Sequence, residues 1–474
     1  MPPPVDMAVD GNFAGRITPP FMYELRGWAS LPLAALALAG LMAIVLFLSR
    51  APYTEQLFTW TGDSYFQKGI VVHVTFAFVV WYMGVHGALT VLMTAQLQGT
   101  RAPPGLFSIF VGRIGLYGAG LSLILLLAPV LADLGEPSLN NYIPVLDHPI
   151  YYAGLGLLAG SVALPVLRLL VLMAHERKAE AAVFSIAAAG VVYVLALVCI
   201  LAAWLTMPDN VGRQGSNEYL MWGGGHVLQF ANTALMLCSF YLIARAALGE
   251  TPLPGSWLKV MMLMLLAGAA AGPLLYLTHE AGGATQRDLF TRLYWYALPI
   301  PTVVVLGRVA HLLVRRWRDA MNGPPEIKAV GIALFLFAFG GVLGFFEGSI
   351  DTRTPAHYHA MLVAVTLTFM ALYFGLFLPL LGRRTKRRLL RTWMYGLLGG
   401  GTVVQTGALY FAGLEGVLRK TAGGAQDLDS PWKLATMIIQ GVGGFGAVAG
   451  GIIFIFLAGG MLLAKPDQGV RPAQ

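Results

Sequence analysis

Long apolar stretches separated by short polar connections run through almost all of this 474-residue chain. A bilayer core about 30 Å thick needs about 20 apolar residues per helix. The pattern therefore predicts twelve transmembrane helices, which begin near Ser30, Gly69, Ile114, Ile150, Ala181, Tyr219, Trp257, Leu293, Lys328, Ala356, Trp393 and Leu434. We expect an all-α integral membrane protein with one membrane domain over 1–474. It comprises a polar N-terminal tail over 1–27, the helices over 28–464 and a C-terminal tail over 465–474.

The composition supports a membrane protein. Hydrophobic residues make up 57% of the chain and charged residues only 11%, whereas soluble globular proteins carry roughly 25% charged residues. This excludes an ordinary soluble enzyme and a disordered chain. The net charge of +8 does not indicate a nucleic-acid partner, because the basic residues fall in connections between apolar stretches. Cys199 and Cys238 both lie inside apolar segments and predict neither a disulfide framework nor a metal-binding pair.

Basic residues gather in connections that follow even-numbered helices. Positive charge marks the cytoplasmic side of a membrane protein. The pattern therefore predicts a multi-pass protein of a bacterial- or archaeal-type cell membrane, with both termini in the cytoplasm. The residues follow helix 4 (Arg177, Lys178), helix 8 (Arg315, Arg316, Arg318, Lys328) and helix 10 (Arg383, Arg384, Lys386, Arg387, Arg388, Arg391).

Five of the nine histidines fall near the ends of helices that place them on one side of the membrane. Ionisable side chains are costly in a bilayer and often mark functional sites. A shared, extracytoplasmic layer of imidazoles predicts a haem or metal site, formed by His73, His226, His279, His357 and His359. In the segment PAHYHAM, residues two apart on a helix point about 200° from each other. One helix thereby presents His357 and His359 to two different haems.

The order and helix placement of these histidines resemble the catalytic subunit of the haem–copper oxidase superfamily, which includes terminal oxidases and nitric oxide reductases. The resemblance covers nearly the whole chain and implies a twelve-helix bundle of the subunit I type. It implies that His73 and His359 bind a low-spin haem and that His357 binds a high-spin haem. It also implies that His226 and a pair on helix 7 hold a second metal.

Two departures from the family pattern bear on the reaction. The helix 7 pair is His279–Glu280 rather than two histidines, which makes Glu280 a candidate carboxylate ligand and leaves copper and non-haem iron open. Phe230 stands where most oxidases carry a tyrosine that supplies an electron and a proton to dioxygen. Tyr276, one turn before His279, is either a relocated substitute or an ordinary buried tyrosine. Together the departures resemble nitric oxide reductases in which a glutamate replaces one histidine ligand.

Other polar residues have weaker candidate roles. Gln229 is a neutral hydrogen-bonding group near His226. Glu347 is either part of a proton supply from outside or a solvated loop acid. Arg419 and Lys420 occupy the place of the family's basic pair for haem propionates, or are ordinary loop charges.

The sequence thus predicts a membrane oxidoreductase that reduces nitric oxide (NO) to N2O, with two haems and one copper or non-haem iron. An oxygen reductase is the alternative, and a transporter or haem carrier is a third possibility. The chain contains no CxxCH haem attachment and no copper-binding loop with paired cysteines. We therefore expect electrons from a second subunit of cupredoxin or cytochrome c type, or from a quinol. The other expected partners are membrane lipids and a small gaseous substrate.

Overall fold

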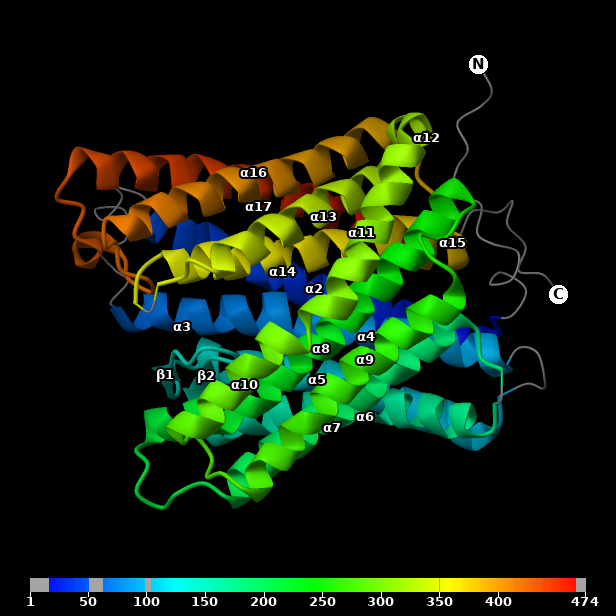
Figure 1. Cartoon of the computed structure of the whole chain (residues 1–474), viewed down its shortest axis with the longest axis horizontal. Coiled ribbons are helices and arrows are strands. Elements are labelled where there is room, and N and C mark those ends of the chain that lie inside the picture. Colours follow the sequence, from blue (N-terminus) through cyan, green and yellow to red (C-terminus); the bar gives the residue numbers. More distant parts are fainter. Residues whose placement is uncertain (1–16, 51–62, 99–103, 177, 349, 466–474) are drawn as a thin grey trace.

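The computed structural model describes residues 17–50, 63–98, 104–176, 178–348 and 350–465. Twelve helical segments in this part of the chain are long and apolar enough to cross a membrane. They confirm the predicted fold class. In chain order (Figure 1), the helices are α2 (Pro19–Arg50), α3 (Asp63–Val74), η2 (Thr75–Val80), α4 (Trp81–Gln98), α5 (Leu106–Leu131), α6 (Pro149–Ala174), α7 (Ala181–Leu205), α8 (Arg213–Leu248), α9 (Gly255–Leu274), η3 (Leu275–Leu277), α10 (Ala284–Tyr296), α11 (Pro299–Arg315), α12 (Trp317–Asn322), α13 (Pro325–Gly344), α14 (Arg353–Leu372), η4 (Tyr373–Phe377), α15 (Leu378–Leu380), α16 (Arg388–Leu414), η5 (Gly423–Gln426) and α17 (Pro431–Leu463).

The first membrane helix begins at Pro19 rather than near Ser30. Glu24 and Arg26 interrupt the apolar pattern there, which is why the sequence predicted a longer tail. The structure buries Glu24 completely and pairs it with Arg168 of α6. A buried charge that has such a partner is compatible with a helix interior. Residues 1–16 of the predicted tail, residues 466–474 and Arg177 lie outside the described residues.

Three membrane spans form the centre of the bundle. The most apolar window is 94% buried in the span Tyr65–Gln98, 94% in Gly215–Leu248 and 83% in Arg353–Leu380. In the other nine spans this share is 56% or less. The central spans, which comprise α3–η2–α4, α8, and α14–η4–α15, carry four of the five predicted site histidines. The fold therefore places these imidazoles on the helices that are best screened from lipid.

Two of the central spans contain a short π-helical segment, an arrangement often found at functional sites. Segment η2 begins two residues after His73, and η4 continues α14. The rings of Trp81 and Tyr373 stack at 5.6 Å between the two spans, and the Tyr373 hydroxyl donates a 2.6 Å hydrogen bond to the carbonyl of Ala29 in α2. The ring contact joins the spans that carry His73 and His359, and the hydrogen bond joins the second of these spans to α2.

A small hairpin covers one end of the bundle between α5 and α6. Strand β1 (Glu136–Ser138) pairs antiparallel with β2 (Val145–Asp147). After β2, the His148 side chain accepts a 3.3 Å hydrogen bond from the backbone N–H of Ile150 and so caps α6. The loop between the strands turns back over the central helices, and its side chains enter the site described below.

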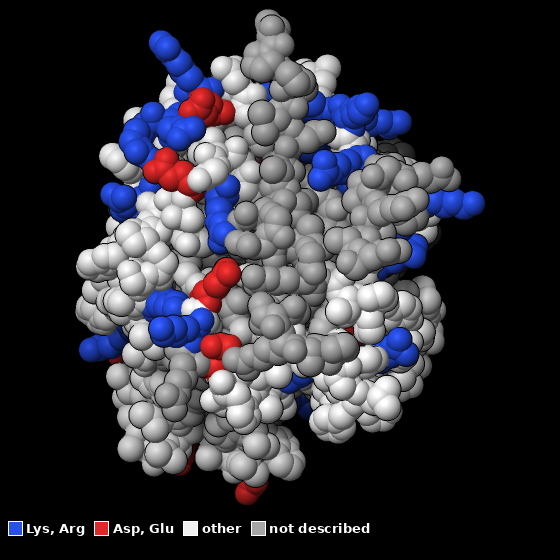
Figure 2. Space-filling model, turned by 90° about the vertical axis from the view of Figure 1, so that its right-hand side faces the viewer, with Lys and Arg blue, Asp and Glu red and all other residues white. Residues whose placement is uncertain are grey.

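The opposite end of the molecule carries α12 and α15 (Figure 1). Blue Lys and Arg side chains gather over this face in Figure 2. The connections that form it include the basic segment from Arg383 to Arg388, between α15 and α16. The basic face and the hairpin thus lie at opposite ends of the helices.

Candidate haem and redox site

Two of the predicted haem ligands are anchored in the same way. The Nδ1 atom of His73 lies 3.0 Å from the carbonyl oxygen of Ala39 in α2. The Nδ1 atom of His359 lies 2.7 Å from the carbonyl oxygen of Pro355, one turn earlier in α14. Because a carbonyl only accepts, each Nδ1 carries the proton and donates it, which leaves the Nε2 lone pair free for a metal. The two rings lie close enough to interact electrostatically. His73 and His359 therefore fit an iron with two imidazole ligands.

His357 has a separate anchor on another side of α14. Its Nδ1 atom donates a 2.7 Å hydrogen bond to the carbonyl of Gly340 in α13. A Cβ atom at Gly344 would lie only 2.7 Å from this nitrogen, so a glycine at 344 lets the ring lie against α13. His357 faces α13, whereas His359 interacts with His73 of α3. The pair thus faces two different neighbours, and the Nε2 of His357 is also free for a haem iron.

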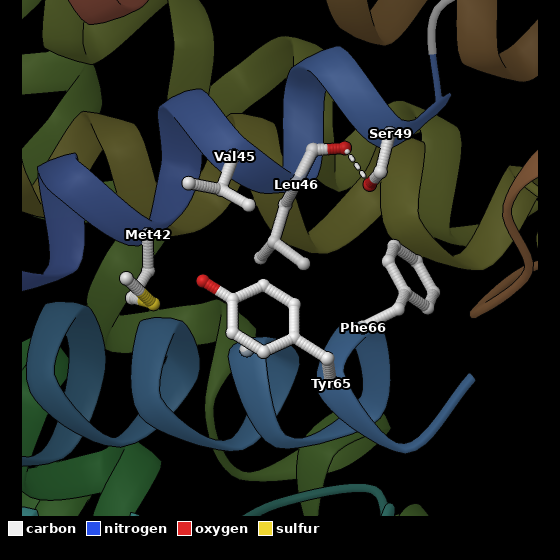
Figure 3. Close-up of a pocket in the computed structure, with 7 residues that line it drawn as sticks. Met42, Val45, Leu46, Ser49, Tyr65 and Phe66 are labelled. Carbon is white, nitrogen blue, oxygen red and sulfur yellow. Dashed lines mark hydrogen bonds between the residues drawn. The ribbon is translucent and has the colours of Figure 1, made fainter. Parts of the chain in front are cut away.

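A small, narrow hollow lies one helical turn before His73. Figure 3 shows Tyr65 and Phe66 of α3 facing Met42 and Leu46 of α2 across it. Apart from the hydroxyl groups of Tyr65 and Ser49, the lining side chains are hydrocarbon or thioether groups. The surface next to His73 is therefore almost entirely apolar.

The surroundings of His226 differ from those of the other three imidazoles. Its Nδ1 donates a 2.8 Å hydrogen bond to the Trp222 carbonyl, which leaves Nε2 as an acceptor. The hydroxyl of Tyr142, from the loop of the β hairpin, lies 3.0 Å from that Nε2 and 3.4 Å from the hydroxyl of Tyr294 in α10. The ring centroid of Tyr294 lies 4.5 Å from that of His226, and the rings of Trp222 and Phe290 lie at 4.8 and 5.6 Å. The phenol of Tyr142 therefore occupies the position next to Nε2 where a second metal would bind.

The predicted metal ligands are not brought together. Nδ1 of His279 hydrogen-bonds to the hydroxyl of its neighbour Thr278 at 2.8 Å, and Glu280 is exposed. No group of three His, Cys, Asp or Glu side chains in the described ranges is placed to hold a metal ion. The helical segment η3 ends at Leu277, and His279 lies in the turn that follows it. His226, His279 and Glu280 as the structure has them do not fit the second metal of the family.

We expect Glu280→Gln to leave the content of non-haem iron and copper in the purified protein unchanged. The exposed carboxylate has no contact with His226 in the described structure. Elemental analysis per haem measures this, with Glu218→Gln as the control, since Glu218 is another carboxylate at this end of the bundle and hydrogen-bonds to Asn141. Selective loss of one metal ion from the Glu280 variant would contradict the expectation and restore the ligand role.

The other candidates near His226 are also separated from it. The buried Tyr276 hydroxyl packs against Gly223, and its ring contacts Phe290 at 5.8 Å rather than His226. Gln229 accepts a 3.3 Å hydrogen bond from Asn232 of its own helix. Glu347 is exposed but interacts electrostatically with Tyr142. Burial raises the pKa of Tyr142 well above its ordinary value, and the charges of Tyr294, Glu218 and Glu347 act in the same direction.

The two residues of the predicted basic pair, Arg419 and Lys420, have different roles. Nη2 of Arg419 donates a 3.2 Å hydrogen bond to Asn141, and its charge acts on Tyr358, between the two histidines of α14. Lys420 instead donates to the carbonyl oxygens of Leu139 and Asn140 in the hairpin loop. Burial lowers the pKa of Lys420 to about 8, with a further contribution from Arg419. Lys420 therefore ties the hairpin to the end of α16, and Arg419 remains beside the haem ligands.

Arg50 is a second cation near the haem ligands that the sequence interpretation missed. It is the last residue of α2, and its charge acts on both Tyr358 and His359. Its guanidinium hydrogen-bonds to Gln426 at 3.4 Å and to the Leu418 carbonyl at 3.5 Å. Guanidinium groups bind carboxylates such as haem propionates well. Arg50 and Arg419, rather than Arg419 and Lys420, are the cations that flank Tyr358.

Residues 28–446 match the protein family described as cytochrome c and quinol oxidase polypeptide I. The chain belongs to this family. It is 22% identical over 496 residues to an uncharacterised protein of Rickettsia prowazekii (strain Madrid E), with 92% of this chain and 95% of that protein covered. An uncharacterised protein of Aquifex aeolicus (strain VF5) is 26% identical over 349 residues, with 73% and 83% covered. A solved heme-copper terminal oxidase dimer has a similar fold, with a TM-score of 0.76 at 16% identity, covering 95% of this chain and 86% of that one.

Membership of the oxidase polypeptide I family confirms the predicted superfamily and the multi-pass membrane location. Membership of this family supports a respiratory oxidoreductase and implies haems and a second metal as cofactors. The residues of this chain fit the haem part of that description. They do not fit the second metal, because a phenol already bonds to the Nε2 of His226.

Sequence reasoning missed Tyr142 and Tyr294 as neighbours of His226. Tyr142 lies in the polar connection between the third and fourth predicted helices, and Tyr294 lies near the start of the eighth. One signal was present: NNYIP places an aromatic residue in a polar loop beside proline. Such a residue needs a buried partner, but the sequence alone does not indicate which one.

Proposed function

We propose that this chain is the catalytic subunit of a membrane oxidoreductase that reduces nitric oxide. Two NO molecules, two electrons and two protons give N2O and water. The observation that carries the proposal is the common state of His73, His357 and His359. In each ring, Nδ1 donates to a backbone carbonyl and Nε2 is left for iron.

Each of these residues has a definite task in the proposed reaction. Haem would supply an iron that carries one electron at a time and can bind a diatomic gas. His73 and His359 would hold one haem, and His357 would hold the other. Their carbonyl partners fix the ring orientation, and Arg50 and Arg419 offer positive charge for the propionates. The central position of α14 keeps both haem sites away from lipid.

Nitric oxide is favoured because its reduction requires only two electrons. Two haems would supply both electrons, and no tyrosine would be needed as a third donor. Phe230 carries no proton or accessible radical, and it is fully buried in α8. We derive no step through a second metal, because the residues around His226 do not fit one. This proposal therefore depends on the haem ligands and not on Glu280.

We also propose that the basic face in Figure 2 lies in the cytoplasm, since Lys and Arg gather there. The hairpin, Arg50 and Arg419 would then face the outside. An electron donor, either a quinol or a second subunit of cupredoxin or cytochrome c type, would reach the low-spin haem from that side.

The first test uses the purified full-length protein in detergent. Reduced-minus-oxidised spectra give the haem count and elemental analysis gives iron and copper. Consumption of NO and of oxygen is then measured side by side with an artificial electron donor. We expect two haems and faster turnover of NO than of oxygen. Faster turnover of oxygen would contradict NO as the substrate, and protein without haem would contradict the proposal entirely.

Oxygen reduction is a second candidate, favoured by the hydrogen bond between Tyr142 and His226. A phenol that donates to an imidazole can give up one electron and one proton, as oxygen reduction demands. The change Tyr142→Phe separates the candidates. For NO reduction we expect little change in turnover, whereas an oxygen reductase that uses this phenol should slow by a factor on the order of 100 or more.

Tyr152→Phe is the matched control for the Tyr142 variant. Tyr152 is a nearby tyrosine of α6 that hydrogen-bonds to Asn217 at 2.7 Å and has no contact with His226. A large loss of NO turnover in the Tyr142 variant alone would contradict its spectator role in our proposal. An equal loss in both variants would mean that the hairpin end of the protein is disturbed rather than a redox residue removed.

A further inference from the structure

A second hollow opens at the basic end of the bundle, far from the haem ligands. It lies between the start of α13, the start of α16 and the end of α17, next to α15 (Figure 1). Its charged lining groups are Arg383, Arg384, Arg391 and Glu326. Three guanidinium groups and one carboxylate give this hollow an excess of positive charge.

Several buried polar atoms of the hollow have no partner in the described structure. The Nε atoms of Arg383 and Arg391 and the Oε2 atom of Glu326 are all in this state. Arg383 is only 6% exposed and Arg391 only 8%. Unsatisfied buried donors on charged groups are expensive, so the two Nε–H groups indicate that an acceptor belongs in this space.

The remaining bonds of these arginines show what kind of acceptor is required. Nη1 of Arg391 donates to Glu326 at 2.7 Å, which neutralises the one carboxylate. Nη2 of Arg383 donates to the Ala464 carbonyl at 3.0 Å, at the end of α17, and burial together with the nearby Arg26 lowers the pKa of Arg383. Arg384 forms no ion pair among the described residues. The unmatched charge therefore calls for an anion.

The backbone around the hollow also favours an anion. Helices α13 and α16 both begin at this hollow, and the amino end of a helix carries partial positive charge that favours anions. Phe374, Pro379 and Met461 complete the lining with apolar surface. An anionic head group with an attached apolar portion fits both features. Basic pockets between helices on the cytoplasmic side of membrane proteins bind such lipids.

We propose that this hollow binds the phosphate group of an anionic phospholipid, with Arg383 and Arg384 as its main contacts. The lipid would link α13, α16 and α17 at the membrane surface. The inference is independent of the reaction proposed above, because none of these residues contacts the haem ligands.

The test measures thermal unfolding of the delipidated full-length protein during titration with a short-chain phosphatidylglycerol. Parallel titrations use phosphatidylcholine of the same chain length and inorganic phosphate. We expect phosphatidylglycerol alone to raise the melting temperature, by roughly 5 °C at saturation. Equal stabilisation by inorganic phosphate would overturn a lipid source, and equal stabilisation by phosphatidylcholine would overturn the phosphate contact with arginine.

Two variants in the connection between α15 and α16 test whether the stabilisation by phosphatidylglycerol comes from this hollow. Arg384→Gln removes an exposed cation that lines the hollow, so we expect it to fold and to need about tenfold more phosphatidylglycerol for half-saturation. Arg387→Gln removes an equal charge from an exposed residue that does not line the hollow, and should leave the titration unchanged. The same shift in both variants, or in neither, would overturn the site.

Discussion

Replacing His359 by alanine should abolish the low-spin haem and leave the high-spin haem in place. His359 and His73 hold the same iron in our assignment, and neither ring has a substitute ligand beside it in the described structure. His73→Ala should therefore give the same spectrum as His359→Ala, although the two residues lie on different helices. His357→Ala should do the reverse and remove only the high-spin signal.

Low-temperature optical and electron paramagnetic resonance spectra of the purified variants measure this directly, without reliance on turnover. His86→Ala is the control. His86 is a fully buried histidine of α4 that contacts Tyr193 edge-on, and neither of its ring nitrogens has a partner in the described structure. If His73→Ala and His359→Ala gave different haem spectra, the two residues would not share an iron. If the His86 variant lost a haem signal as well, our choice of ligands would be incomplete.

The part of the fold that the sequence predicted correctly rests on regular spacing. Twelve apolar stretches specify twelve helices, and the 200° separation of His357 and His359 follows from helix geometry alone. The structure indeed directs the two residues towards different helices, α13 and α3. Such features depend on residues close together in the chain, and for this reason periodicity is enough to find them.

The partners of His226 could not be predicted in this way. Tyr142 and His226 are 84 residues apart, and their contact depends on how the hairpin folds back over α8. The dipeptide His279–Glu280 resembled a ligand pair by its position after α9. The turn that follows η3 determines where it points, and no local pattern reveals that direction. Distant contacts of this kind decide between a metal site and a phenol–imidazole cluster.

Charges inside helices misled the prediction for a related reason. Glu24 made the first turns of α2 look like a polar tail, because a lone carboxylate ends an apolar pattern. Its partner Arg168 lies 144 residues later, in α6. The start of α16 has the same arrangement, in which Arg391 pairs with the buried Glu326. In both cases the bundle neutralises a charge that the local sequence leaves unpaired.

We expect Arg168→Met to destabilise the protein by about 3–5 kcal/mol, because it leaves the carboxylate of Glu24 buried and uncompensated. The guanidinium donates to both oxygens of Glu24, at 3.1 and 2.6 Å, and to the carbonyl of Ser108 in α5 at 2.8 Å. It also lies 5.4 Å from the centre of the Phe21 ring. One side chain thus holds α2, α5 and α6 together, and α5 has room for it only because position 112 is glycine.

The double variant Glu24→Leu/Arg168→Met shows whether the stability loss comes from the unpaired charge or from the packing around the pair. Replacing both members of a buried ion pair by apolar residues is often neutral or stabilising, so the double variant should recover most of the stability lost in Arg168→Met. Unfolding of the purified proteins in mixed detergent and SDS measures both differences. If the double variant were as unstable as Arg168→Met, the loss would come from the bond to Ser108 and from packing. The loss of stability in Arg168→Met would then not be caused by a buried, unpaired Glu24.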